Sequence, residues 1–102
     1  MDFTIEEKDG KTYAKITGRV GTAETAEFEQ QMRPLFMEDN PDIYMDCSGL
    51  EYVSSSGLRL FFTLQQSVNE RKGHLVVANL TPVVRRVFDM TGFSKIINVQ
   101  QR

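Results

Sequence analysis

Three consecutive serines, Ser54, Ser55 and Ser56, precede Gly57 in the middle of the 102-residue chain. Hydroxyl groups at the start of a helix can cap its free amide groups, and the same amides with the helix dipole stabilise a phosphate placed there. The local sequence admits the simple interpretation that Ser55 or Ser56 is only an N-cap residue. Because three serines exceed the needs of one cap, a phosphate site is the alternative.

Hydrolytic and metal chemistry have little support among the other reactive residues. A serine nucleophile needs a base and an orienting group, and the sole histidine is His74. Val53 precedes the serines, so the glycine-flanked nucleophile elbow is absent. One histidine and one cysteine give no metal-ligand spacing, and we expect Asp46 to be a hydrogen-bonded structural carboxylate. We therefore expect no enzyme activity, metal or cofactor, and a small serine hydrolase is only a third interpretation.

Composition restricts the class of protein further. The glycines of Gly18-Arg19-Val20-Gly21 match neither the dinucleotide fingerprint nor the phosphate-loop pattern. Twelve basic and fourteen acidic residues give a net charge of -2, so no basic field attracts nucleic acid. The single cysteine and the lack of a leader or a long apolar run predict a cytoplasmic protein without membrane insertion. With 40% hydrophobic residues, we expect one domain over residues 1–102.

The first third of the chain predicts a hairpin and a helix. Strand-like runs at 3–8 and 12–17 are separated by an Asp-Gly turn at 9–10. Thr22 is the expected cap of the following helix. Pro34 should kink or shorten its last turn, and of the two we expect the kink. Helical spacing gives this helix a buried stripe of Phe28, Met32, Leu35 and Phe36.

The rest of the chain alternates strands and helices. The patterns predict a central strand at 43–47, a loop at 48–55, a helix at 56–72, a strand at 75–78, a helix at 81–91 and a last strand at 96–99. We expect the central strand to be apolar on both faces because helices cover it. The fold class is therefore α/β, with a mixed sheet packed with helices. The serines then lie at the carboxyl end of a strand, where ligands and partners usually bind.

Residues 46–58, DCSGLEYVSSSGL, closely resemble the signature of the STAS domain, a family shared by anti-sigma factor antagonists and sulfate transporter tails. In that family an Asp-x-Ser-Gly strand end is followed by Asp-Ser-Ser-Gly-Leu at a helix start. A second matching stretch extends from Gly73 to Ile97, so the resemblance spans most of the chain. It implies a mixed sheet packed with helices, in agreement with the element order predicted above.

The resemblance implies partner switching as the function. In that scheme the unphosphorylated domain binds an anti-sigma factor, a serine kinase of the histidine-kinase-like ATPase class reverses the binding, and a serine phosphatase restores it. By position Ser55 matches the phosphorylated serine, with Ser56 and Ser54 as lesser candidates. The implied partner-binding residues are Ser54, Ser55, Ser56, Gly57, Leu58 and Arg59.

Two positions differ from the family pattern. Ser54 stands where the family usually has Asp, and Gly21 stands where an Asp often follows the first glycine-containing strand. Both acidic neighbours of the expected phosphorylation site are thus missing. The differences favour an alternative function, a constitutive scaffold or transporter-accessory subunit that uses the same surface without phosphorylation.

Overall fold

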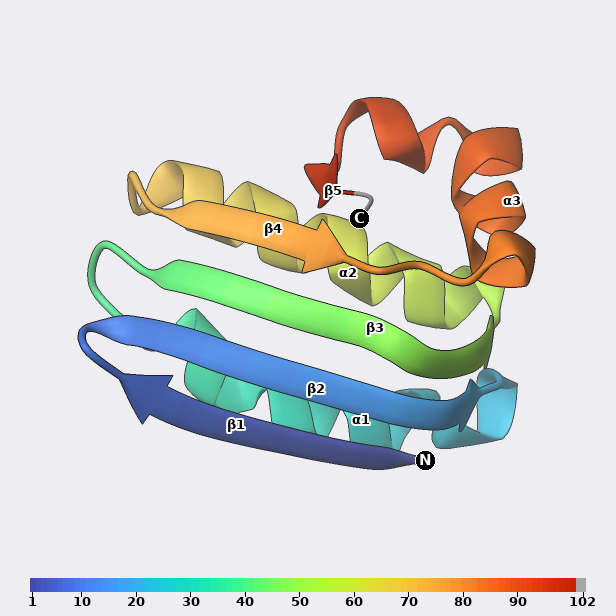
Figure 1. Cartoon of the computed structure of the whole chain (residues 1–102), viewed down its shortest axis with the longest axis horizontal. Helices are drawn as coiled ribbons and strands as arrows, with labels where there is room; N and C mark the ends of the chain where they lie inside the picture. Colours follow the sequence, from blue (N-terminus) through green and yellow to red (C-terminus); the bar gives the residue numbers. More distant parts are fainter. Residues whose placement is uncertain (101–102) are drawn as a thin grey trace.

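A computed structural model describes residues 1–100, which form one five-stranded sheet in the order β1-β2-β3-β4-β5 (Figure 1). The strands are β1 (Asp2–Lys8), β2 (Lys11–Val20), β3 (Asp42–Val53), β4 (His74–Ala78) and β5 (Val99–Gln100). β1 pairs antiparallel with β2 through the predicted hairpin, and every other neighbouring pair is parallel. The sheet is therefore mixed, as predicted.

Three α-helices and three short 3-10 helices connect the strands. They are η1 (Thr22–Glu24), α1 (Thr25–Met32), η2 (Arg33–Phe36), α2 (Ser55–Glu70), α3 (Pro82–Thr91) and η3 (Phe93–Lys95). In Figure 1, α1 and α2 lie behind the sheet, and α3 lies at one end beyond β4. Within residues 1–100, no helix combines the length and the apolar character needed to cross a membrane.

The prediction that the central strand is apolar on both faces is wrong. Along β3, Ile43 and Met45 are buried, whereas the alternate residues Asp42, Tyr44 and Asp46 are at least partly exposed. Successive side chains of a strand point to opposite faces, so this alternation means that helices cover only one face. The other face of the sheet is open.

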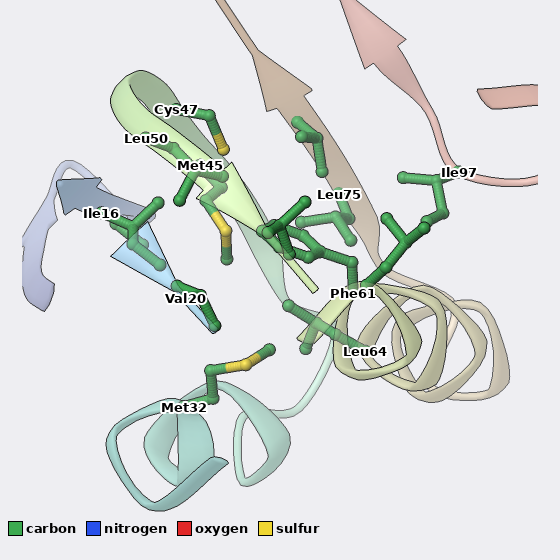
Figure 2. Packing of buried hydrophobic residues seen from close by; sticks show 14 of the residues in the cluster. Ile16, Val20, Met32, Met45, Cys47, Leu50, Phe61, Leu64, Leu75 and Ile97 are labelled. Atoms are coloured by element: carbon green, nitrogen blue, oxygen red, sulfur yellow. The ribbon is translucent and has the colours of Figure 1, made fainter. Parts of the chain in front are cut away.

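The core fills the space between the sheet and the helices. Figure 2 shows side chains of β2, β3 and β4 meeting Phe61 and Leu64 of α2 and Met32 of α1. The Phe61 ring lies 5.4 Å from that of Phe28 and 5.6 Å from that of Phe88, which joins all three α-helices. Each buried aromatic side chain contributes roughly 1.5–3 kcal/mol to stability. These contacts fix the position of α2 beneath the sheet.

β3 is longer than predicted, and this changes the setting of the serines. The expected loop at 48–55 is wrong, because β3 continues to Val53 by pairing with β2 beyond two register irregularities. A Cβ on Gly49 would lie 2.5 Å from Thr17 Cγ2, so the two strands approach closely there. Only Ser54 separates β3 from α2. The serine segment is therefore held by regular structure on both sides.

Helix ends follow the sequence in part. The expected cap at Thr22 is wrong, since Gly21 precedes η1 and its N–H donates to Glu24 Oε1 at 2.8 Å. Pro34 shortens the helix, and the expected kink within it is not what the structure shows: α1 ends at Met32 and the chain continues as the 3-10 helix η2. The predicted helix at 81–91 is also confirmed, with Thr81 as its cap. The last strand begins only at Val99 instead of at position 96.

Candidate functional site

Ser54 is the N-cap residue of α2. Its backbone is extended, with φ -79° and ψ 170°, and its Oγ accepts a hydrogen bond from Gly57 N at 3.2 Å. Its own N–H donates to Val20 O at 2.8 Å, which ties the start of α2 to the end of β2. The prediction that Ser55 or Ser56 is the cap is wrong. A cap needs the extended backbone that Ser54 has, and the other two serines already belong to the helix.

The Ser56 hydroxyl belongs to a chain of hydroxyl contacts. Ser56 Oγ lies 3.1 Å from Ser54 Oγ and 3.0 Å from Thr25 Oγ1. Thr25 Oγ1 in turn donates to Gly21 O at 3.2 Å. The chain thus links the junction of β3 and α2 to the turn between β2 and α1. Two of the three serine hydroxyls are occupied in holding the site together.

Ser55 differs from both neighbours. It is exposed as the first residue of α2, and its hydroxyl makes no hydrogen bond with any residue in the described range 1–100. The first amides of a helix carry the positive end of its dipole and lack intrahelical acceptors. An anionic group on Ser55 would therefore have a favourable electrostatic setting.

The structure brings the six predicted partner-binding residues into little more than one helical turn but gives them different surroundings. Ser55 and Arg59 are exposed, four residues apart and therefore on the same helix face. Ser56 is half-buried. The buried members are Ser54, Gly57 and Leu58, at 7% exposure for Ser54 and 1% for Leu58. Ser55, Arg59 and the exposed part of Ser56 are thus accessible to a partner. The buried residues hold these side chains in position.

Gly57 allows α2 to approach the sheet. A Cβ at this position would lie 2.9 Å from Val20 Cγ1 and 3.0 Å from Val53 Cγ2. Both distances are too short for unstrained carbon contacts. The glycine therefore fixes how closely the start of α2, and Ser55 with it, sits against the ends of β2 and β3.

One feature of the site escaped the sequence analysis. The Arg19 guanidinium lies 4.7 Å from the centre of the Tyr52 ring, a cation–π contact between paired residues of β2 and β3. Arg19 precedes Gly21 by two residues and Tyr52 precedes Ser54 by two, so the pair flanks the serine junction. The sequence gives only a weak indication of this contact. Arg19 and Tyr52 lie opposite each other because of the β2–β3 register, which shifts at two irregularities before it reaches them.

Asp46 has the structural role expected of it. Partial burial favours its neutral form, but hydrogen bonds from Ser48 and Asn79 and the charge of Lys15 outweigh this and lower the pKa of Asp46. The two bonds measure 3.0 Å from Ser48 N and 3.1 Å from Asn79 Nδ2, both to Oδ1. Asp46 is therefore a carboxylate at neutral pH and links β3 to the residue that follows β4.

The other reactive side chains lie away from the serines. His74 pairs with Asp42 at the start of β3, whereas the serines follow the end of that twelve-residue strand. Burial raises the pKa of the Cys47 thiol, which lies in the core. Among the residues that the structure describes, no three His, Cys, Asp or Glu side chains gather where they could hold a metal ion.

Comparison with known proteins gives consistent matches over almost the whole chain. The sequence model of the STAS domain matches residues 2–102. BtrV of Bordetella bronchiseptica, provisionally assigned as an anti-sigma factor antagonist, is 30% identical over 99 residues, which cover 97% of this chain and 85% of BtrV.

Two solved structures show the same fold. An anti-sigma factor antagonist from Mycobacterium paratuberculosis superimposes with a TM-score of 0.85 at 21% identity, covering 96% of this chain and 83% of that one. The Bacillus cell fate determinant SpoIIAA, solved in its phosphorylated form, gives a TM-score of 0.72 at 15% identity, covering 99% and 91%. The predicted α/β fold with a mixed sheet is thereby confirmed.

Proposed function

Because the chain belongs to the STAS domain family, we propose that it is an anti-sigma factor antagonist, a regulatory protein without catalytic activity. The surface around Ser55 and Arg59 binds the anti-sigma factor, and phosphorylation of Ser55 ends the binding. The observation that carries this proposal is the difference between the serines. Ser54 and Ser56 are engaged in hydrogen bonds, whereas Ser55 is exposed and makes none within residues 1–100.

A phosphate on Ser55 acts by charge and bulk. It adds about -1.5 to -2 charges at neutral pH. Arg59, one turn further along α2, is near enough in sequence to pair with it, and the helix amides favour it. A partner that uses Ser55 and Arg59 as contacts then meets a bulky anion in place of a small hydroxyl. Release needs no refolding, because the hydroxyl chain through Ser56 stays in place.

The partners follow from the same scheme. The anti-sigma factor is itself a serine kinase of the histidine-kinase-like ATPase class, or acts beside one, and a serine phosphatase resets the switch in the cytoplasm. The assignments of BtrV and of the mycobacterial protein as anti-sigma factor antagonists support the partner class. The existence of a phosphorylated form of SpoIIAA supports the modification.

The test combines site mapping with binding. The full chain is incubated with ATP and purified histidine-kinase-like ATPases from the same genome, and mass spectrometry locates the phosphate. We expect modification of Ser55, its loss in Ser55→Ala, and no change in Ser94→Ala, a control serine that follows α3. By calorimetry, Ser55→Ala should bind the same ATPase at least ~10-fold more tightly than Ser55→Asp. Modification of another residue, or equal binding by the two variants, contradicts the proposal.

A second candidate is a constitutive scaffold or transporter-accessory subunit. It is favoured by Ser54 and Gly21, which replace the two acidic residues of the family pattern. In this case every kinase leaves Ser55 unmodified, and the chain co-purifies with a transporter ATPase instead of an anti-sigma factor. Phosphate mapping and identification of the co-purified protein therefore separate the two functions.

A further inference from the structure

The open face of the sheet is the one turned toward the reader in Figure 1, away from α1 and α2. The residues of this face carry charges in an ordered arrangement. We call its central part the sheet-face patch: Lys11, Tyr13 and Lys15 of β2, and Asp42, Tyr44 and Asp46 of β3. The register pairs Tyr13 with Tyr44 and Lys15 with Asp46. Thr12 of β2 pairs with Ile43 of β3. Lys11 comes directly before Thr12 and Asp42 directly before Ile43, so Lys11 lies at the end of the β2 column and Asp42 at the end of the β3 column. A basic column thus runs beside an acidic column, with a tyrosine at the centre of each.

The side chains of this patch are ordered among themselves. The Tyr13 and Tyr44 rings lie 5.9 Å apart, and Lys11 Nζ lies 5.9 and 5.8 Å from their centres. Tyr13 is nevertheless 40% exposed. The single ion pair within residues 1–100 is between Arg85 and Asp89 of α3. The opposite charges of the two columns therefore do not neutralise each other by direct contact.

We propose that the sheet-face patch binds a second copy of this chain, forming a two-fold symmetric dimer. The geometry follows from a two-fold axis that runs parallel to the strands, between β2 and β3, in the plane of the interface. Such an axis places β2 of one copy over β3 of the other at the same height. Lys11 then faces the second copy's Asp42, and Lys15 faces its Asp46. Two-fold symmetry repeats each contact, so four pairs of opposite charge form at once.

The tyrosines complete the centre of this interface. Each Tyr13 lies over the second copy's Tyr44, and tyrosine is a residue type enriched at protein interfaces. Two sheets that pack face to face stand about 10 Å apart with their strands within roughly 30° of each other, so the outward rings of both copies fill the gap. Because β2 and β3 are parallel and the axis runs along them, these strands point the same way in both copies.

Charge complementarity selects a second copy over other occupants. A uniformly acidic partner would be attracted by Lys11 and Lys15 but repelled by Asp42 and Asp46. A uniformly basic partner would be attracted by the two aspartates and repelled by the two lysines. The copy of this chain carries both columns in the matching order. Asp46 contributes its charge at neutral pH because its carboxylate is stabilised by hydrogen bonds from Ser48 and Asn79.

The size of the patch sets the strength of the dimer. With the flanking strands β1 and β4 added to the two strands of the patch, four strands spaced ~4.8 Å apart, over about five residues at ~3.3 Å each, give a footprint of roughly 300 Å² per copy. Stable complexes bury about 800 Å² per partner, so we expect a weak, reversible dimer that forms at high protein concentration and low salt. The axis also brings both Ser55 segments to the same end of the dimer, because each follows the carboxyl end of β3. The dimer therefore presents two partner-binding surfaces in one direction.

Sedimentation equilibrium of the full chain tests this dimer without any anti-sigma factor, so its outcome is independent of the proposed function. Between 20 μM and 2 mM at ~20 mM salt, we expect the average mass to rise from 11.7 kDa toward twice that value, and to fall back at ~500 mM salt. The double variant Lys11→Glu with Lys15→Glu makes both columns acidic and should lose at least ~10-fold in association. A matched control, Arg86→Glu with Lys95→Glu, makes the same charge change on α3 and η3 and should dimerise as the original chain does.

A dilution series followed by amide NMR locates the interface and remains valid if a variant folds poorly. The concentration-dependent shifts should centre on Tyr13 and Tyr44 and spare α3. A mass of 11.7 kDa at every concentration overturns the proposal. The proposal is also overturned if the double variant Lys11→Glu with Lys15→Glu associates as strongly as the original chain, or if the shifts centre on a helix instead of on β2 and β3.

Discussion

The replacement Ser54→Ala tests the assignment of Ser54 as the cap of α2. It removes the acceptor of the Gly57 N–H, which typically costs about 1 kcal/mol at an N-cap. It also removes the 3.1 Å contact with Ser56 Oγ, worth roughly 0.5–1 kcal/mol more. We therefore expect a loss of about 1.5–2 kcal/mol in the free energy of unfolding. For a domain of this size each kcal/mol lowers Tm by roughly 4–8 °C.

Urea unfolding followed by circular dichroism measures this loss as a shift in the midpoint at constant m-value. The matched control is Ser55→Ala, which removes an exposed hydroxyl and should change stability by less than about 0.5 kcal/mol. Ser54→Asp should retain most of the stability, since Asp is as good an N-cap residue as Ser. If Ser55→Ala destabilised the chain as much as Ser54→Ala, the division of the serines into a structural residue and a free one would be wrong.

Three further predictions concern Gly57 of the site and two residues of β3, Asp46 and Cys47. Gly57→Ala should lower stability by about 1–2 kcal/mol in urea unfolding, because its methyl group would press on Val20 and Val53. The pKa of Asp46 is lowered in the folded state, so its stabilising effect is complete above the unfolded pKa of 3.8 and is lost as pH falls through the folded value. Asp46→Asn should therefore be less stable than the original chain at pH 6, and urea midpoints should show this difference shrinking as the pH falls below 3.8. The buried Cys47, with its raised thiol pKa, should react with Ellman's reagent no faster than the chain unfolds, whereas reaction in the folded state would contradict its position.

The order of elements was predictable because the local signals were strong. The Asp-Gly turn gave the first hairpin, and the Thr81-Pro82 pair gave the start of α3. The open face of the sheet was not predictable, since Tyr44 beside Ile43 and Met45 reads as apolar although its ring stands at the surface. Local sequence does not reveal how many layers of helix cover a strand.

The serines were correctly predicted to lie between a strand and a helix, but their separate structural roles were not predicted. Three adjacent serines are equivalent in sequence, and only the end of β3 at Val53 decides which one takes the extended cap position. That end depends on pairing with β2, a contact between residues more than thirty positions apart. The contact between Arg19 and Tyr52 was missed for the same reason.

The central claim is that Ser55 controls binding at the start of α2. The most direct measurement is a calorimetric titration of the anti-sigma factor with the full chain, unphosphorylated in one experiment and stoichiometrically phosphorylated on Ser55 in the other. The account predicts that the unmodified chain binds and that the phosphorylated chain binds at least ~10-fold more weakly, with its fold unchanged by circular dichroism. Equal affinities for the two forms would contradict it.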